Sequence, residues 1–574
     1  MGFGKAGPCE FNKGTNFADS SISEYSLNFL MKIKLSSNFN AMRKSIIIVT
    51  TILNFLVGSV FSQVVGVAPI IHLDMESSRS VEQPSFTLTL NGQDSITDGI
   101  SGKSRFFKDG SFLLVDDNQS LSSLWGEKDF SVEVWVQTKA QNTDYAVIAS
   151  NKDWNSGEIK DFTTNASFGI SRTSGSNKGW AIVCQPDGSW TWNIGDGKYR
   201  LDYRPTSPRQ QINDAEWHQI VFSIDRDDKE ARMYFDGQNV AIYNLGGISD
   251  LNSMLPIGLG NDANLNNQQP SFEGAIDEFS VYDYVISREE VARKYKQYVP
   301  AAKLPELSTK RIDKLNLMAW NIWHGGRRHG REIGPQQVID FIKDTGTDIV
   351  MMQETYGSGA LIADALGYYF YLASTNISVI SKYPILKTWT VYDAFRCGVT
   401  TIELSEKQTI NLASLWIHYL PAWRSDSNKP DATAEKLVLG EGETRHKEIK
   451  KIVSILGPYI KNANAVPLII GGDFNSPTHK DWTEETSQWH NGLVVEWPVS
   501  KVMIEAGFYD SFREIRSDVN YASPTMSAKQ LTYHIDYIYY KGKGVKAVDS
   551  DMHFKYKGIW PSDHPAVTST FLLK

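Results

Sequence analysis

The stretch PLIIGGDFNSPTH, residues 467–479, decides the fold of the C-terminal half of the chain. Apolar residues lead into Gly471 and Gly472, and Asp473, an aromatic residue, Asn475 and a proline turn follow. A short apolar run bounded by glycines and turn residues is typical of a buried strand. The stretch therefore predicts a strand that ends in a carboxylate and a carboxamide, on a backbone that the glycines leave open to close approach.

Strands and helices alternate on both sides of this stretch, from residue 311 to residue 574. Helical periodicity is found at 335–346 and, over a longer amphipathic segment, at 443–460. Strands are expected at 314–323, 347–354, 377–385, 400–405, 409–420, 466–475, 534–542 and 565–573. Such alternation predicts an α/β sandwich with a mixed rather than purely parallel sheet.

Polar side chains stand at or just past the ends of these strands, where binding sites of α/β sheets gather. Phosphoester hydrolysis needs a hard divalent cation held by oxygen atoms, an activated water and donors around the phosphoryl oxygens. Residue types suited to these tasks are Asn321, Glu354, His418, Asp473, Asn475, Asp536, Asp563 and His564.

Six motifs in this half resemble, in order, those of the endonuclease/exonuclease/phosphatase superfamily. They are MAWNIWHGG, DIVMMQET, LASLWIHYLP, IIGGDFNSPTH, HIDYIYYKG and WPSDHPAV. That superfamily includes deoxyribonuclease I-like nucleases, abasic-site endonucleases, neutral sphingomyelinases and inositol-phosphate phosphatases. The resemblance implies a four-layered α/β sandwich and a magnesium or manganese ion.

The resemblance also implies roles for the metal-side residues. Glu354 matches the principal metal ligand, Asn321 stands beside it, and Asp563 is a further carboxylate on the metal side. Asp473 matches the carboxylate that orients or deprotonates the attacking water, and Asn475 matches the amide that contacts phosphate.

The histidines receive the remaining roles. His418 is placed to donate a hydrogen bond to a phosphoryl oxygen, and His564 is the candidate general base or oxyanion stabiliser. Asp536 is expected to fix the tautomer of His564 and to raise its basicity, as in other carboxylate–histidine pairs.

The loop HGGRRHG, residues 324–330, has two equally weighted interpretations. It is either an exposed loop, or a basic lip in which His324, Arg327 and Arg328 bind a second phosphate or anionic group. Many members of the superfamily have arginine where this chain has His534, and a threonine–tryptophan pair where this chain has Met526, at two positions near the rim of the cleft in the family pattern. These departures leave the substrate open.

Residues 66–297 predict a different architecture. Short alternating segments such as FSVEVWVQT, 130–138, are separated by turn residues, a pattern typical of an all-β sandwich. Together with AEWHQIVFSID, ARMYFDGQ, IGLGNDAN and FEGAIDEFSVYDYVISREEVARKY, this segment resembles a laminin-G or concanavalin A-like lectin domain. The resemblance implies a jelly-roll sandwich with a sugar or protein ligand and, in some members, calcium.

Two features of this half are candidate ligand sites. Trp190 and Trp192 lie in a turn-rich segment and are candidates for stacking on a ligand, against the alternative of ordinary core residues. Asp262, Asn264 and Asn267 form an oxygen-rich loop that either holds calcium or is simply solvated.

The N-terminus has the pattern of a secretory signal. A basic start at 42–44 precedes an apolar stretch and small residues that predict cleavage after Ser62; an uncleaved membrane anchor is the alternative. Three cysteines, Cys9, Cys184 and Cys397, exclude a disulfide framework. The expected organisation is an extension and signal at 1–62, the lectin-like domain at 66–297, a linker at 298–310 and the α/β domain at 311–574.

Charge narrows the choice of substrate only slightly. The α/β half has 29 basic and 29 acidic residues, so it lacks the basic footprint of a tight nucleic-acid binder. The expected function is a secreted metal-dependent phosphoesterase that acts on nucleic acid or small phosphodiesters and whose lectin-like module binds a glycan or extracellular protein. Sphingomyelinase-like or inositol-phosphate phosphatase activity remains open, as does an adhesion protein with an inactive catalytic half.

Overall fold

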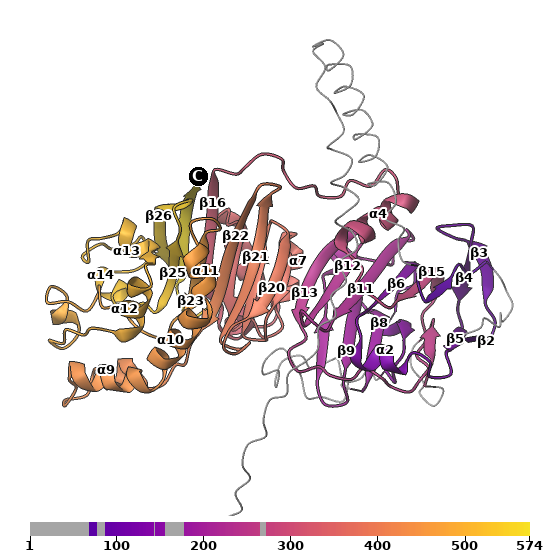
Figure 1. Cartoon of the computed structure of the whole chain (residues 1–574), viewed down its shortest axis with the longest axis horizontal. Coiled ribbons are helices and arrows are strands. Elements are labelled where there is room, and N and C mark those ends of the chain that lie inside the picture. Colours follow the sequence, from indigo (N-terminus) through magenta and orange to yellow (C-terminus); the bar gives the residue numbers. More distant parts are fainter. Residues whose placement is uncertain (1–67, 77–85, 143, 155–176, 265–270) are drawn as a thin grey trace, which may run out of the picture. The chain divides into compact units, whose positions relative to one another are not determined.

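The computed structural model describes residues 68–76, 86–142, 144–154, 177–264 and 271–574 (Figure 1). The expected signal and Asn267 lie outside the described residues. Within them, no helix is long and apolar enough to cross a membrane. Cys184 and Cys397 are buried free thiols.

The N-terminal half is built from two sheets of antiparallel strands, as expected. One sheet has the order β10-β9-β8-β7-β14-β5-β2, and the other continues β13-β12-β11-β6-β15-β4-β3 with β1 beside β15. Along β6 (Phe130–Gln137), Val132, Val134 and Val136 belong to the core between the sheets. The further strands are β1 (Ile71–Leu73), β2 (Thr87–Asn91), β3 (Ser95–Asp98), β4 (Lys103–Phe107), β5 (Phe112–Asp116), β7 (Ala146–Ser150), β8 (Gly179–Cys184), β9 (Trp190–Gly195), β10 (Arg200–Tyr203), β11 (His218–Asp225), β12 (Glu230–Phe235), β13 (Gln238–Asn244), β14 (Ile257–Leu259) and β15 (Gly274–Tyr282).

The interpretation of Trp190 and Trp192 as ligand-stacking residues is wrong. Both side chains are fully buried on β9, where they belong to the main hydrophobic core. The Trp190 indole donates to Gln210 Oε1 at 2.9 Å and stacks on Phe235. Every residue of β9 is buried, so both of its faces are covered despite the turn residues around it.

The proposed calcium loop is already engaged by the backbone. The carboxylate of Asp262 is 2% exposed, and its two oxygens accept hydrogen bonds from the N–H groups of Trp154 and Asn264 at 2.8 and 3.1 Å. Burial raises the pKa of this carboxyl to about 6. The described part of the loop therefore fits a structural role for Asp262 and gives no support to calcium.

The C-terminal half is a sandwich of two sheets. One has the order β26-β27-β16-β17-β19-β18 and the other β20-β21-β22-β23-β25-β24. The pairs β16/β17 and β22/β23 are parallel and the other pairs are antiparallel, which confirms a mixed sheet. The strands are β16 (Lys314–Asn321), β17 (Ile349–Gln353), β18 (Tyr369–Leu372), β19 (Ile377–Ser381), β20 (Ile385–Thr390), β21 (Cys397–Ser405), β22 (Gln408–Trp416), β23 (Leu468–Asp473), β24 (Tyr509–Asp510), β25 (Asp536–Lys541), β26 (Val545–His553) and β27 (Ala566–Leu573).

Helices cover the outer face of each sheet. Val338 and Ile342 of α6 (Ile333–Asp344) pack on the first sheet with Met318 and Val350. Residues of α10 (Arg445–Ile455) and α12 (Pro498–Glu505) pack on the second sheet (Figure 1). Since Leu317 and Ile469 meet in one core between the sheets, the predicted four layers are confirmed.

The expected helix 443–460 is two helices. α10 ends at Ile455, and α11 (Gly457–Asn462) begins after Leu456. Pro458 has no backbone N–H and cannot continue the hydrogen-bond ladder of α10, which explains the break.

Strand pairing also joins the two halves, which the sequence did not predict. β13 of the lectin-like half pairs in parallel with β18, with Ala241 opposite Phe370, so that one sheet of 14 strands runs through both. Asp364 on α7 (Gly359–Leu366) is 5% exposed and accepts hydrogen bonds from Thr206 N and Gln210 Nε2 at 2.8 and 2.7 Å. Residues 299–313, between α4 (Arg288–Tyr298) and β16, contain no helix or strand.

Candidate active site

Four neighbouring strands bring the candidate residues to one edge of the sandwich. β16 ends at Asn321, and Glu354 directly follows β17, its parallel neighbour. In the other sheet, Asp473 at the end of β23 stands opposite Asp536 at the start of β25. Strand register alone thus places two carboxylates side by side.

Asn321 links the two sheets at the site. Its side chain is fully buried, and Nδ2 donates to Glu354 Oε1 and to Asp473 Oδ2, both at 3.1 Å. Its Oδ1 accepts the backbone N–H of Trp323 at 3.0 Å. Because one amide group donates to both carboxylates, Asn321 fixes their separation.

Glu354 occupies a strained backbone position. Its φ of 55° is in the left-handed region, which disfavours residues other than glycine by about 1–2 kcal/mol. Asn376 Oδ1 accepts a hydrogen bond from the Glu354 N–H at 3.0 Å, and the Gly325 N–H donates to the Glu354 carbonyl at 2.7 Å. The backbone N–H of His324 donates to Oε2 at 3.3 Å. The sequence analysis did not identify Asn376 as a site residue. The only indication in the sequence is that Asn376 lies just before β19.

Asp473 is held by the loop that follows it. The backbone N–H of Asn475 donates to Oδ1 at 2.8 Å, and Asn475 Nδ2 contacts Oδ2 at 3.2 Å and Ile417 O at 2.8 Å. Asn475 has a φ of 49°, a conformation that asparagine tolerates better than most residues. This turn directs both side chains to the same side.

The two glycines serve packing rather than phosphate access. A Cβ on Gly472 would lie 2.0 Å from Leu415 O, and one on Gly471 would lie 2.5 Å from Met351 Cε. The first contact is with the neighbouring strand and the second with the facing sheet. The expectation that the glycines make room for a phosphate is therefore wrong.

His564 lies among carboxylates. Its Nδ1 is 3.0 Å from Asp536 Oδ2, while Nε2 is 3.9 Å from both Asp473 Oδ2 and Asp563 Oδ1. Burial alone would lower the pKa of this imidazole, but Asp536 and Asp473 overcome that effect and raise the pKa to about 10. The two carboxylates therefore favour the imidazolium form of His564, with Nδ1–H donating to Asp536.

The carboxyl of Asp473 is shifted in the same environment. Burial raises its pKa to about 7; His564 opposes the rise and Asp536 adds to it. A carboxyl that titrates near neutrality beside an imidazolium is suited to accept a proton while the histidine donates one. These pKa shifts favour proton acceptance by Asp473 and donation by His564.

His418 and Asp563 lie at the rim. The Leu420 N–H donates to His418 Nδ1 at 2.9 Å, which leaves the proton of the neutral ring on Nε2. His418 follows Ile417, the residue whose carbonyl accepts from Asn475, so it adjoins the Asp473 loop. The side chain of Asp563 is 51% exposed.

The loop 324–330 is tied to the segment that carries His564. Arg328 Nη1 donates to Ser562 O at 2.8 Å, and His329 contacts Trp560 O. Arg327 is half-buried, and burial together with Arg331 lowers its pKa. His324 is exposed and stacks on Tyr356 beside Glu354.

Ser562 is a second residue that sequence reasoning missed, although it lies inside a quoted motif. Its hydroxyl donates to Asn321 O at 2.6 Å and accepts the His564 N–H at 3.0 Å. It therefore joins the metal-side residue Asn321 to the histidine.

The donor set suits a divalent metal. Asp473, Asp536 and His564 each bring a possible ligand atom within 4.8 Å of one another. Because His564 Nδ1 is already bonded to Asp536, the Glu354 carboxylate and the Asn321 Oδ1 beside it are the better ligands for a hard cation. Asp536 Oδ1 is buried and has no hydrogen-bond partner in the described part of the chain.

Comparisons with known proteins agree with this picture for both halves. Residues 318–564 match the model of the Endonuclease/Exonuclease/phosphatase family, and residues 110–292 match that of the Concanavalin A-like lectin/glucanases superfamily. The uncharacterized protein F14F9.5 of Caenorhabditis elegans is 27% identical over 288 residues, covering 45% of this chain and 91% of that protein.

Solved structures are similar at low sequence identity. The catalytic domain of human Nocturnin with bound sulfate is 16% identical, covers 46% of this chain and 97% of its own, and has a TM-score of 0.31. Truncated Caenorhabditis elegans TDP2 is 16% identical over 45% of this chain and 97% of its own, with a TM-score of 0.31. The binding domain of Paraclostridial Mosquitocidal Protein 1 is 19% identical over 40% of this chain and 53% of its own, with a TM-score of 0.27.

Proposed function

The C-terminal half is an endonuclease/exonuclease/phosphatase domain behind a concanavalin A-like domain, and on this premise we propose that the protein is an exported, divalent-metal-dependent phosphodiesterase. The observation that carries the proposal is the hydrogen-bonded chain from Glu354 through Asn321 to Asp473, with His564 held at Asp536 beside it. It provides an acceptor and a donor of protons next to carboxylates that suit a cation.

Each residue of the site has a separate role in an in-line attack of water on phosphorus. Asp473 orients the attacking water and accepts its proton. His564, as the imidazolium held by Asp536, donates toward a phosphoryl oxygen, and His418 Nε2–H is a further donor. Asn475 uses both amide hydrogens on Asp473 Oδ2 and Ile417 O, so its part is to hold Asp473 in place. Bound at Glu354 and Asn321, a magnesium or manganese ion would neutralise charge on the phosphoryl group.

The substrates proposed first are nucleic acid and small phosphodiesters. The α/β half is electrically neutral overall, which suits transient contact with an anionic chain. The lectin-like half is proposed to bind a glycan or an extracellular protein. Because Trp190 and Trp192 are core residues, that ligand must be bound by other side chains.

The test is nicking of supercoiled plasmid and hydrolysis of bis(4-nitrophenyl) phosphate by the full chain with magnesium. Asp473→Asn keeps the shape of the side chain and is expected to abolish both activities. Asp227→Asn, in an exposed turn of the other half, removes the same charge and is expected to change neither.

The outcomes separate the alternatives. Hydrolysis of the small diester without nicking would redirect the search to lipid head groups and inositol phosphates. Failure of both activities in folded protein that binds a glycan would refute the proposal in favour of an adhesion protein. Export is checked separately, because the mature protein is then expected to begin at Gln63 on N-terminal sequencing.

A further inference from the structure

A cavity of about 570 Å³ opens beside His564. Its walls come from the loop after β22, from α8 (Trp423–Asp426), from α14 (Ala528–Leu531) and from the start of β25. Asp536 and Asp563 also line it, whereas the described lining does not include Glu354 or Asn321. The cavity thus extends the site on the histidine side, away from the metal-side carboxylate.

Two cationic side chains, Arg424 and Lys529, line this cavity. The guanidinium of Arg424 lies 5.6 Å from the ring centroids of both Trp423 and Tyr533, which hold it in place. Lys529 is exposed on α14. Among the described residues, neither forms an ion pair, whereas nearby Lys429 is paired with Asp426 at 2.7 Å.

A buried histidine also borders this cavity. His534, one of the cavity-lining residues, is 2% exposed. Its Nδ1 donates to Leu531 O and lies 3.2 Å from Asp481 Oδ2, while Nε2 has no hydrogen-bond partner among the described residues.

We propose that this cavity binds a second phosphate of the substrate, attached beyond the scissile phosphodiester, with Arg424 and Lys529 as the specificity-determining residues. This inference rests on the proposed phosphodiesterase function. Unpaired cations attract an anion and repel a cation such as a choline head group. The rings of Tyr419 and Tyr533 leave an apolar wall for the group that carries the second phosphate.

Two kinds of substrate share this chemistry, nucleotides and inositol phosphates, and the experiment separates them. The full chain is assayed on dithymidine monophosphate with and without a 5′-phosphate, and on glycerophosphoinositol with and without a 4-phosphate. The measured quantity is the ratio of kcat/KM for the member of each pair with the second phosphate to that for the member without it.

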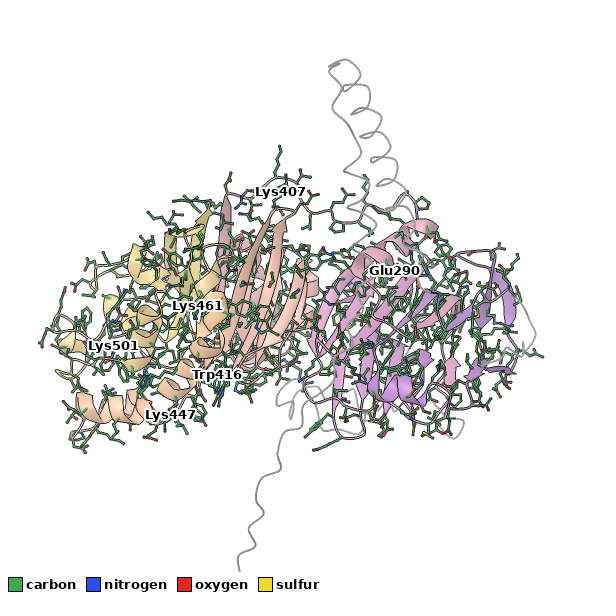
Figure 2. All side chains as sticks on the ribbon, viewed as in Figure 1. Glu290, Lys407, Trp416, Lys447, Lys461 and Lys501 are labelled. Atoms are coloured by element: carbon green, nitrogen blue, oxygen red, sulfur yellow. The ribbon has the colours of Figure 1, made fainter. Side chains whose placement is uncertain are left out.

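The ratio is expected to be about ten or more for at least one pair, and to fall close to one in Arg424→Gln and Lys529→Gln, since each loses a charged contact. The larger ratio identifies the source of the phosphate. Lys529→Arg keeps the charge and is expected to keep the ratio. Lys461→Gln, on α11 and labelled in Figure 2, is the matched control for loss of one exposed lysine.

The melting temperature of each variant shows whether it is folded. Because Lys529 is exposed to solvent, its substitution is the one that is least expected to destabilise the fold. Hydrolysis of both members of each pair with a ratio near one in the wild-type chain would overturn the inference and leave the proposed function standing. A wild-type ratio that survives both substitutions would overturn it too. Absence of hydrolysis with every substrate would instead refute the proposed function, and this inference with it.

Discussion

Replacing Asp536 with asparagine tests the arrangement around His564 directly. The two carboxylates near the ring raise its pKa from 6.5 to about 10, which corresponds to about 5 kcal/mol in favour of the protonated form. Coulomb attraction falls with distance, and Asp536 is 3.0 Å away where Asp473 is 3.9 Å away. Asp536 therefore supplies somewhat more than half of the carboxylates' effect. Because burial opposes that effect, it exceeds the net shift, and the share of Asp536 is at least about 3 kcal/mol, or about two pKa units.

The pKa of His564 in Asp536→Asn is accordingly expected near 8. If the imidazolium is the donor, kcat/KM of the wild-type enzyme is lost as pH rises through about 10, and the variant loses it about two pH units earlier. At pH 9 the protonated fraction then falls from about nine tenths to about one tenth, so the variant loses about tenfold more activity at pH 9 than at pH 7.

The assay is a kcat/KM profile from pH 6 to pH 10.5, together with an NMR titration of carbon-labelled histidine in the metal-free protein. Asp563→Asn is the control, because that carboxylate lies 3.9 Å from His564 Nε2 but is 51% exposed, so solvent screens it. An unchanged alkaline limb in Asp536→Asn, or an equal shift in Asp563→Asn, would refute the reasoning.

Further predictions concern the acid limb, the metal, the core and the joined sheet. Because Asp473 must be ionised to accept a proton and its pKa is raised to about 7, kcat/KM is expected to rise through about pH 7; a limb near pH 4 would exclude Asp473 as the base. Magnesium at 100 times its Kd is expected to stabilise the wild-type chain by about 3 kcal/mol in calorimetry and to have no such effect on Glu354→Gln, with exposed Glu505→Gln behaving as wild type. Trp190→Ala is expected to lower the free energy of unfolding by about 3–5 kcal/mol in urea, and a surface-like loss below about 0.5 kcal/mol would contradict its burial. Since one core cluster contains residues of both halves, the full chain is expected to unfold in a single calorimetric transition, and two separate transitions would contradict this.

The position of the site could be predicted because strand ends are visible in the sequence. Asn321 and Asp473 each end an apolar run in the sequence. The pairing of β23 with β25 then places Asp473 opposite Asp536. Whether these residues play the catalytic roles stays a prediction. The contacts that hold them could not be predicted, because Asn376 and Ser562 act across the fold on residues distant in the chain.

Other features escaped prediction for different physical reasons. The turn residues around Trp190 and Trp192 suggested exposure, but burial depends on which sheet lies above β9, which local pattern does not encode. The pairing of β13 with β18 also has no local signal, because any edge strand offers the same backbone groups. Gly471 and Gly472 were expected to make room for a ligand. The structure shows instead that a side chain at either position would clash with the neighbouring strand or the facing sheet.

The left-handed backbone around Glu354 has a consequence for how this protein could change under selection. His324, Glu354, Tyr356 and Asn475 all have positive φ between 36° and 55°, a conformation that glycine adopts without strain. Glycine at such a position is expected to stabilise the fold by up to about 1 kcal/mol while removing a side chain from the site. A library enriched only for heat resistance would therefore accumulate glycines at the mouth of the site and drift toward inert proteins, whereas variants retained for turnover would keep the strained residues.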